Sequence, residues 1–142
     1  MNKQDMEEAA PLLIVALDGR VVAVDVETGE EEWRSDLPGA GLGPVSLGVT
    51  KRSVYASAGS RLFRLDYTTG ETLWEVRLAG LVGRRSTILL DGDRVYVARG
   101  GELTCVTPKG ELLWTQGLAG TGTGSAALGV PGNVSQADVV GG

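Results

Sequence analysis

The sequence contains no histidine and a single cysteine, Cys105. Histidine is the commonest general base and metal ligand, so its absence argues against a Ser–His–Asp hydrolase and against most metal sites. A lone cysteine excludes a disulfide within the chain. Cys105 lies in the middle of an expected strand, and we interpret it as a structural thiol rather than a reactive one. We therefore expect no enzyme activity, no bound metal and no cofactor.

The chain also lacks an excess of positive charge and any long apolar run. Its net charge is −5, which argues against nucleic acid and anionic membranes as partners. No stretch reaches the ~20 apolar residues of a membrane span. The apolar run at 12–17 is short and follows acidic residues, unlike a secretory signal. We therefore expect a cytoplasmic protein whose residues 1–11 form a poorly ordered leader.

Glycine, in contrast, is abundant. It accounts for 22 of the 142 residues, whereas there are only five prolines. This glycine share is about twice the average for soluble proteins. Apolar runs lie between the glycines, so the composition indicates many tight turns rather than disorder.

The three tryptophans reveal an internal repeat. Trp33, Trp74 and Trp114 are separated by steps of 41 and 40 residues, and a glycine precedes each of them by four positions. Between these anchors, short apolar runs alternate with turn residues in the manner of β-strands. A period of ~40 residues with four strands per repeat is typical of a β-propeller blade.

One repeat divides into four expected strands, at residues 86–90, 94–98, 102–106 and 111–116, which we call A, B, C and D. The chain begins at a B strand (12–17) and ends with an A strand (126–130), followed by "ADVVGG" as a further B strand or a loose tail. The predicted three-blade unit spans 12–142, with repeats at 12–43, 44–84 and 85–124 and closing strands at 125–142.

The turn between strands C and D carries the most specific pattern. In repeat one it contains Asp25, Thr28, Gly29 and Trp33. In repeat two the same positions are Asp66, Thr69, Gly70 and Trp74, whereas repeat three keeps only Gly110 and Trp114 around "TPKG". Glycine supplies the positive φ that a tight hairpin requires, and the preceding aspartate can accept hydrogen bonds from the turn.

This pattern resembles the tryptophan-docking motif of PQQ-like, quinoprotein-type β-propeller repeats. The resemblance implies an all-β propeller of four-stranded blades, with each tryptophan serving blade-to-blade packing rather than chemistry. Members of the family include quinone-dependent dehydrogenases and non-catalytic interaction proteins. Fold alone does not separate them, but the chain shows no paired vicinal cysteines for a quinone site.

Three blades do not close a ring, because propellers contain about 4–8 blades. An open arc would expose apolar faces and unpaired strand edges. We therefore expect the chain to be its own partner, with the A strand of one copy completing the opening blade of another in a six-bladed homodimeric ring. The alternative is a portion of a longer propeller or of an assembly with another protein.

The leading functional hypothesis is a non-enzymatic module for protein–protein interaction or scaffolding. The alternatives are a propeller that binds a small ligand or carbohydrate, and a fragment of a quinoprotein dehydrogenase. The B–C and D–A connections should gather at one face, where a partner would meet charged side chains. The candidate residues on this face are Arg20, Arg61, Arg84, Arg85 and Arg99.

Overall fold

The computed structural model describes residues 11–78, 85–120, 122 and 124–135, which form thirteen strands. Blade 1 contains β1 (Leu12–Leu17), β2 (Arg20–Asp25) and β3 (Glu31–Asp36). Blade 2 contains β4 (Val45–Val49), β5 (Ser53–Ala58), β6 (Arg61–Asp66) and β7 (Thr72–Arg77). Blade 3 contains β8 (Ser86–Asp91), β9 (Arg94–Arg99), β10 (Glu102–Val106) and β11 (Leu112–Gly117). A closing hairpin follows, with β12 (Leu128–Val130) and β13 (Asn133–Ser135).

Every sheet is an antiparallel meander in chain order. Blades 2 and 3 have four strands, and blade 1 has the three strands B, C and D. These findings confirm the all-β class and the four-stranded repeat. In the part of the chain that the structure describes, no helix is long and apolar enough to cross a membrane.

The end of the chain differs in detail from the prediction. The A strand is present as β12, but its B partner is β13 at Asn133–Ser135, whereas the sequence suggested 137–142, which lies outside the described residues. The turn joining the two strands is Pro131–Gly132, with Gly132 at a φ of 79°. Proline followed by glycine is the sequence of a type II turn, so this dipeptide marks the strand boundary.

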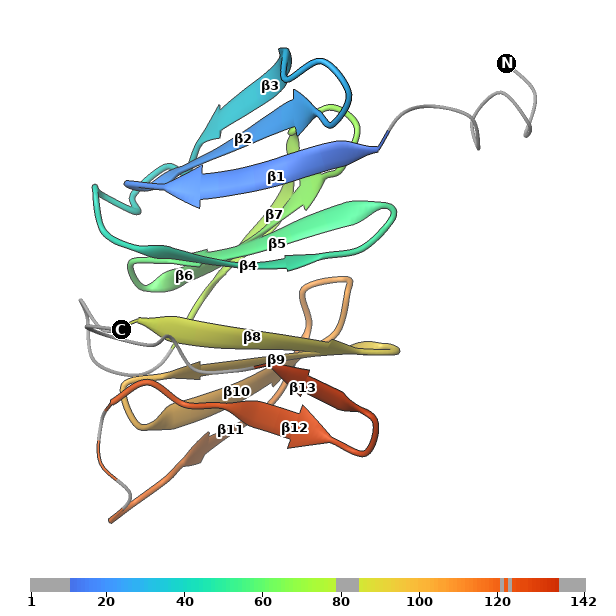
Figure 1. Ribbon diagram of the computed structural model, residues 1–142. Coiled ribbons are helices and arrows are strands. Elements are labelled where there is room, and N and C mark those ends of the chain that lie inside the picture. Colours follow the sequence, from blue (N-terminus) through green and yellow to red (C-terminus); the bar gives the residue numbers. More distant parts are fainter. Residues whose placement is uncertain (1–10, 79–84, 121, 123, 136–142) are drawn as a thin grey trace.

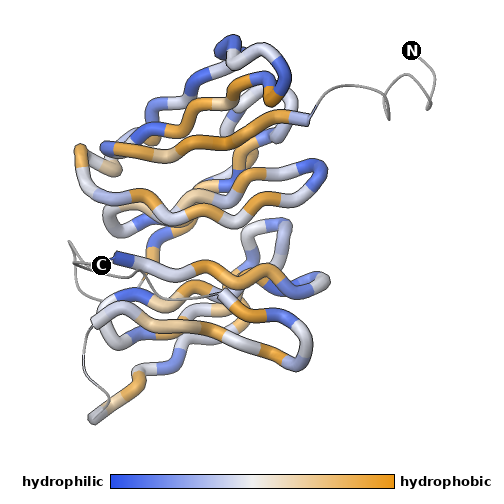
Figure 2. The backbone as a smooth tube through the Cα atoms, viewed as in Figure 1, coloured by the Kyte–Doolittle hydropathy of each residue, from blue (hydrophilic) through white to orange (hydrophobic). Residues whose placement is uncertain are grey.

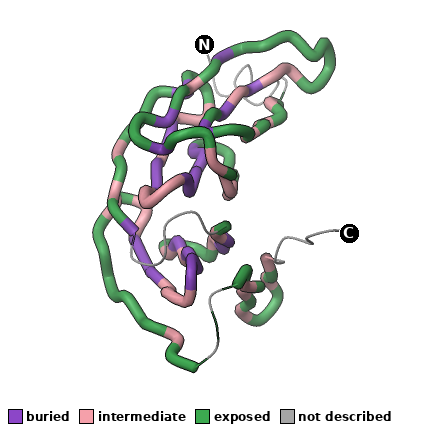
Figure 3. The backbone as a smooth tube through the Cα atoms, turned by 90° about the vertical axis from the view of Figure 1, so that its left-hand side faces the viewer, coloured by how far each residue is buried: buried purple, intermediate pink, exposed green. Residues whose placement is uncertain are grey.

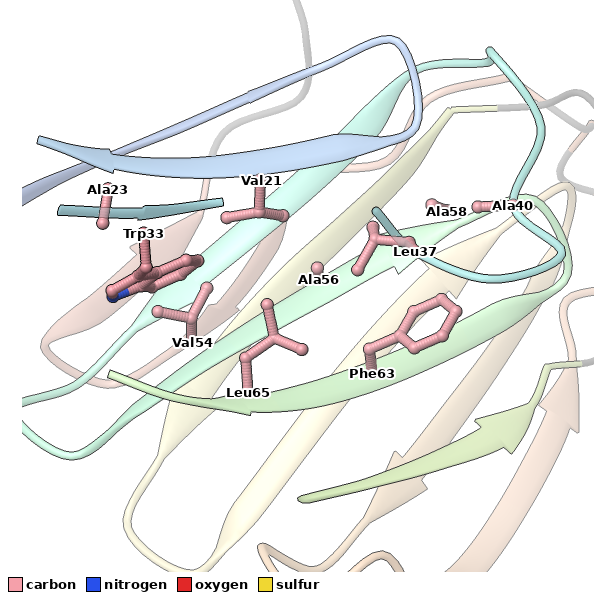
Figure 4. Close-up of a cluster of buried hydrophobic side chains, with 10 residues drawn as sticks. All are labelled: Val21, Ala23, Trp33, Leu37, Ala40, Val54, Ala56, Ala58, Phe63 and Leu65. Atoms are coloured by element: carbon pink, nitrogen blue, oxygen red, sulfur yellow. The ribbon is translucent and has the colours of Figure 1, made fainter. Parts of the chain in front are cut away.

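The blades stack face to face along an arc, and their inner strands β1, β4 and β8 lie side by side (Figures 1 and 3). The packed faces form two core clusters. The first lies between blades 1 and 2 and includes Val21, Trp33, Val54 and Phe63 (Figure 4). The second lies between blades 2 and 3 and includes Tyr55, Leu62, Ile88 and Val97.

Burial along each strand follows from the pleat, because alternate side chains point to opposite faces of a sheet. All six residues of β5 are buried, since blade 2 has a neighbour on each face. In β1 only alternate residues are covered, and Leu13 and Leu17 on the other face are 55% and 52% exposed. Figure 2 shows apolar segments along the strands and polar segments at the turns. The outer face of blade 1 thus exposes apolar side chains along β1.

Candidate functional site: the blade seams and their two open ends

Each internal seam is closed by a tryptophan from the outer strand of one blade. Trp33 in β3 donates its Nε1–H to the carbonyl oxygen of Tyr67 at 2.9 Å. Trp74 in β7 donates in the same way to the carbonyl oxygen of Pro108 at 2.8 Å. Both acceptors lie in the C–D turn of the following blade, so each indole links two blades through packing and one hydrogen bond.

The turn glycine is required because the indole ring lies directly against it. A Cβ atom on Gly70 would lie 2.3 Å from Cε3 of Trp33, and one on Gly110 would lie 2.9 Å from Cδ2 of Trp74. Both glycines also have a positive φ, 77° and 88°. Both the positive φ and the lack of space for a Cβ atom therefore require glycine at these two positions.

Aspartate builds the receiving turn. Asp25 accepts hydrogen bonds through Oδ1 from the backbone N–H groups of Glu27 (2.7 Å) and Thr28 (3.1 Å). In repeat two, Asp66 Oδ1 accepts in the same way from Thr68 and Thr69, both at 2.9 Å. These Asx turns hold the glycine and the acceptor carbonyl in position.

The C–D turn of repeat three also accepts a tryptophan, although its residues differ from those of the other two turns. Thr107 occupies the aspartate position, and its Oγ1 accepts a hydrogen bond from the N–H of Glu111 at 3.2 Å. The turn is one residue shorter than the others, yet it still receives Trp74 on the carbonyl of Pro108. The departure of "TPKG" from the repeat pattern therefore leaves this docking contact intact.

Two seam residues were missed by the sequence reasoning. The Tyr67 hydroxyl accepts from the N–H of Leu12 at 2.7 Å and donates to its carbonyl oxygen at 3.2 Å, so it ties the start of β1 to blade 2. Arg64 donates to the carbonyl oxygen of Pro108 and to Ser53 Oγ (2.7 Å). The signal for Arg64 was its place in the slot that Ala23 and Cys105 fill in the other repeats.

Blade 3 presents a tryptophan that has no such seat among the described residues. Trp114 is 42% exposed, and its neighbours Leu112 and Leu113 are 62% and 41% exposed. Its ring contacts Tyr96, with the centroids 6.2 Å apart. A cavity of about 200 Å³ opens between blade 3 and the closing hairpin, lined by Trp114, Tyr96, Leu103, Leu128 and other residues.

Blade 1 presents the complementary acceptor turn. Its turn has the same Asx bonds as the turn of blade 2, and Gly29 has a φ of 76°. Among the described residues, nothing lies within 4 Å of a Cβ placed on Gly29, unlike Gly70 and Gly110. Within the part of the chain that the structure describes, blade 3 thus carries an open donor surface and blade 1 an open acceptor surface.

Two arginines of the predicted face form ion pairs with acidic side chains. Arg20 forms an ion pair with Asp36 and Arg61 one with Glu75, both at 3.0 Å. Arg85 is exposed at the start of blade 3, and Arg84 lies outside the described residues. B–C turns and D–A connections do meet at one end of the blades (left in Figure 1), where Gly19 N–H donates to the carbonyl of Gly43.

Arg99 is buried rather than surface-exposed. Its side chain is held between blades, donating from Nη1 to the carbonyl of Gly59 (2.8 Å) and from Nη2 to that of Leu78 (3.3 Å). Burial lowers the pKa of this guanidinium from its ordinary value. The contacts give Arg99 a structural role, in which it bonds to backbone of blade 2.

Cys105 is fully buried, and this burial raises the pKa of its thiol, which disfavours the reactive thiolate. Within the described ranges, no group of three or more Cys, Asp or Glu side chains could hold a metal ion. A polar hollow of about 320 Å³ lies along the inner strands, lined by Ser46, Ser86, Thr87, Arg85 and neighbouring residues.

Comparison with known proteins agrees with this architecture. The family model described as outer membrane protein assembly factor BamB matches residues 9–142. A protein of that name from Alkalilimnicola ehrlichii is 34% identical over 101 residues, which are 69% of this chain and 25% of the relative. The chain therefore spans about a quarter of that relative's length.

Solved structures show the same fold at low identity. BamB from Moraxella catarrhalis superposes with a TM-score of 0.66 at 17% identity, over 92% of this chain and 44% of that one. AztD from Citrobacter koseri gives 0.63 at 16% identity, over 82% and 34% of the two chains. A europium-containing methanol dehydrogenase gives 0.58 at 16% identity, over 75% and 22%.

Four-stranded meander blades joined by docked tryptophans define a β-propeller protein of the PQQ-like repeat class. Within that class, the chain belongs to the family of the outer membrane protein assembly factor BamB.

Proposed function

We propose that this chain is a non-enzymatic module for protein–protein interaction, and that one of its partners is a second copy of itself. The observation that carries the proposal is the pair of exposed apolar surfaces at the two ends of the arc. Leu13 and Leu17 are exposed on blade 1, and Leu112 and Trp114 on blade 3. Contiguous exposed apolar surface of this kind is typical of interaction sites.

The family supports a role in interaction over catalysis. The matching relative is described as an assembly factor and is 34% identical over 101 residues, whereas the dehydrogenase structures that share the fold are 16–22% identical. Two copies would supply six blades, within the range of closed propellers. A homodimeric six-bladed ring is therefore the assembly we propose.

Solution mass tests this proposal directly. Light scattering on the 14.8 kDa chain should show one defined species of twice that mass at micromolar concentration. The same sample, supplied with pyrroloquinoline quinone, calcium, an artificial electron acceptor and simple alcohols, should show no turnover. Quinone-dependent turnover would overturn the non-enzymatic role. A monomer at every concentration would overturn the proposed self-association.

The polar hollow favours a second candidate, a small-ligand or carbohydrate-binding propeller. Its lining of serine, threonine and arginine side chains offers hydrogen bonds to a hydroxylated ligand. Binding of a glycan on an array, lost in a Ser46→Ala variant, would favour this function. The cytoplasmic location expected from the N-terminal sequence stays a prediction, which cell fractionation tests.

A further inference from the structure

The two internal seams share one geometry, in which an indole from strand D lies on the turn glycine of the next blade. The nearest ring atom is Cε3 of Trp33 at Gly70 and Cδ2 of Trp74 at Gly110, and in both seams the indole Nε1–H bonds to a carbonyl oxygen of the same turn. The seam is thus a repeating contact with a donor half and an acceptor half.

The two open ends are the missing halves of one more such contact. Gly29 lies in a turn built like the acceptor turn at Gly70, and Val26 holds the position of the acceptor Tyr67, three residues before the glycine. Trp114 holds the donor position of Trp33 and Trp74. A donor surface on one copy therefore complements an acceptor surface on another, which is a heterologous contact.

We propose that Trp114 of one copy docks on the Gly29 turn of a second copy, with its Nε1–H bonded to the carbonyl of Val26. This contact rests on the proposed self-association and specifies how it occurs. Two copies related by a twofold axis would form it twice, and each blade 1 would gain the A strand that it lacks.

In a single copy, the closing hairpin occupies the position that β1 of the second copy takes in this contact. In blades 2 and 3 the A strand pairs with the B strand of the same blade, β4 with β5 and β8 with β9. At the end of the arc β12 plays strand A, and β13 occupies the B position through only three residue pairs. An incoming β1 must take the place of β13 to bring its C–D turn onto Trp114.

Strand β1 is the better partner for β12 by length. It has six residues, as many as β5 and β9, whereas β13 has three and is held to blade 3 by a bond from Asn133 Nδ2 to the carbonyl of Leu90 (2.6 Å). Among the described residues, β1 pairs only with β2, so its other edge is available. Because β12 itself has three residues, the exchange gives a longer ladder only when residues 125–127 join the strand.

A disulfide between cysteines introduced in β1 and β12 would report the register in which the two strands pair. Leu13 is the second residue of β1, as Val134 is the second residue of β13, and Val134 pairs with Gly129, so Leu13 of a second copy should face Gly129. Such a pair brings Cα atoms to about 4.5–5.5 Å, within the range of a disulfide. Strands β1 and β12 lie at opposite ends of the chain (Figure 1), so a bond between them joins two copies.

The test oxidises a Leu13→Cys, Gly129→Cys variant and follows its mass without reductant. We expect a covalent dimer, whereas the matched Leu17→Cys, Gly129→Cys variant, with the cysteine four residues further along β1, should stay uncrosslinked. In parallel, Trp114→Ala and Gly29→Asn should each weaken the dimer at least about tenfold, as loss of an interface tryptophan does. Gly92→Asn is the control, since Gly92 also has a positive φ and open space around its Cβ position.

The outcomes separate this contact from self-association itself. A wild-type dimer that gives no Leu13–Gly129 bond and keeps its strength in the Trp114→Ala variant would overturn the docking contact but leave self-association intact. A wild-type monomer at all concentrations would overturn both. The docking contact is supported if only the predicted cysteine pair crosslinks. The dimer should also be weakened by Trp114→Ala and Gly29→Asn but not by Gly92→Asn.

Discussion

Three tryptophans occupy one position of the repeat but have different surroundings. Trp33 is 8% exposed and docked, whereas Trp114 is 42% exposed. Replacing Trp33 by alanine should cost about 3–5 kcal/mol, typical of a large buried side chain, while Trp114→Ala should cost less than about 1 kcal/mol. Urea unfolding at the lowest workable protein concentration measures both, and equal losses would contradict the different roles.

Buried and exposed arginines should also differ in their contribution to stability. Arg99 is 3% exposed and donates to two carbonyl oxygens, so Arg99→Ala leaves buried acceptors without these donors. Hydrogen bonds of charged groups contribute about 1.5–3 kcal/mol each, and we expect a loss of at least about 2 kcal/mol. The control is Arg20→Ala, which removes an exposed ion pair worth about 0–1 kcal/mol. A larger loss from Arg20→Ala than from Arg99→Ala would refute this assignment.

Cys105 should make the protein sensitive to alkaline pH. Burial raises its thiol pKa, an effect that Arg94 opposes and Asp93 adds to. The unfolded chain, with a thiol pKa of about 8.5, then loses its proton at a lower pH than the folded chain. Stability is unaffected below that pH and falls above it.

Cys105→Ala tests this pH dependence, because alanine fills the same slot in repeat one as Ala23. The unfolding midpoint should fall less between about pH 8 and pH 10 in the variant than in the wild type. Part of the fall should persist, since burial also raises the pKa of Tyr55. Identical pH profiles would contradict a raised thiol pKa.

At the scale of elements, local patterns predicted the strands well. The strands expected at 86–90 and 102–106 are β8 and β10, displaced by one residue at most, because turn residues and alternating apolar positions are local signals. The seam contacts are not local: Trp33 bonds to Tyr67, 34 residues away. The motif predicted that tryptophan docks, but the burial of Arg99 and the role of Tyr67 depend on how neighbouring blades meet.

The closing hairpin should limit how tightly two copies associate. Asn133→Ala removes the side-chain bond to the carbonyl of Leu90 and should loosen β13. If β13 competes with an incoming β1, this destabilising change tightens the dimer, by up to about fivefold for each displaced hairpin when the bond is worth about 1 kcal/mol. Analytical ultracentrifugation compares the two dissociation constants, and a weaker dimer in the variant would count against competition between β13 and β1.

At the scale of the whole molecule, stability and assembly should be linked. A partner that binds only the folded chain raises its apparent stability by mass action. We therefore expect the thermal midpoint of the wild type to rise with protein concentration from about 1 to 100 µM. Irreversible aggregation would lower the midpoint instead, so the sign of the change separates assembly from loss of soluble protein.

Trp114→Ala provides the matched comparison, since Trp114 is 42% exposed within one copy and, in the proposed contact, contributes to stability chiefly through docking. Its thermal midpoint should match that of the wild type at low concentration and stay nearly constant as concentration rises. A midpoint that rises equally in both proteins would mean that the copies associate through another surface. Because closing a ring buries two apolar blade faces at once, the wild type should also bind less hydrophobic dye as concentration increases.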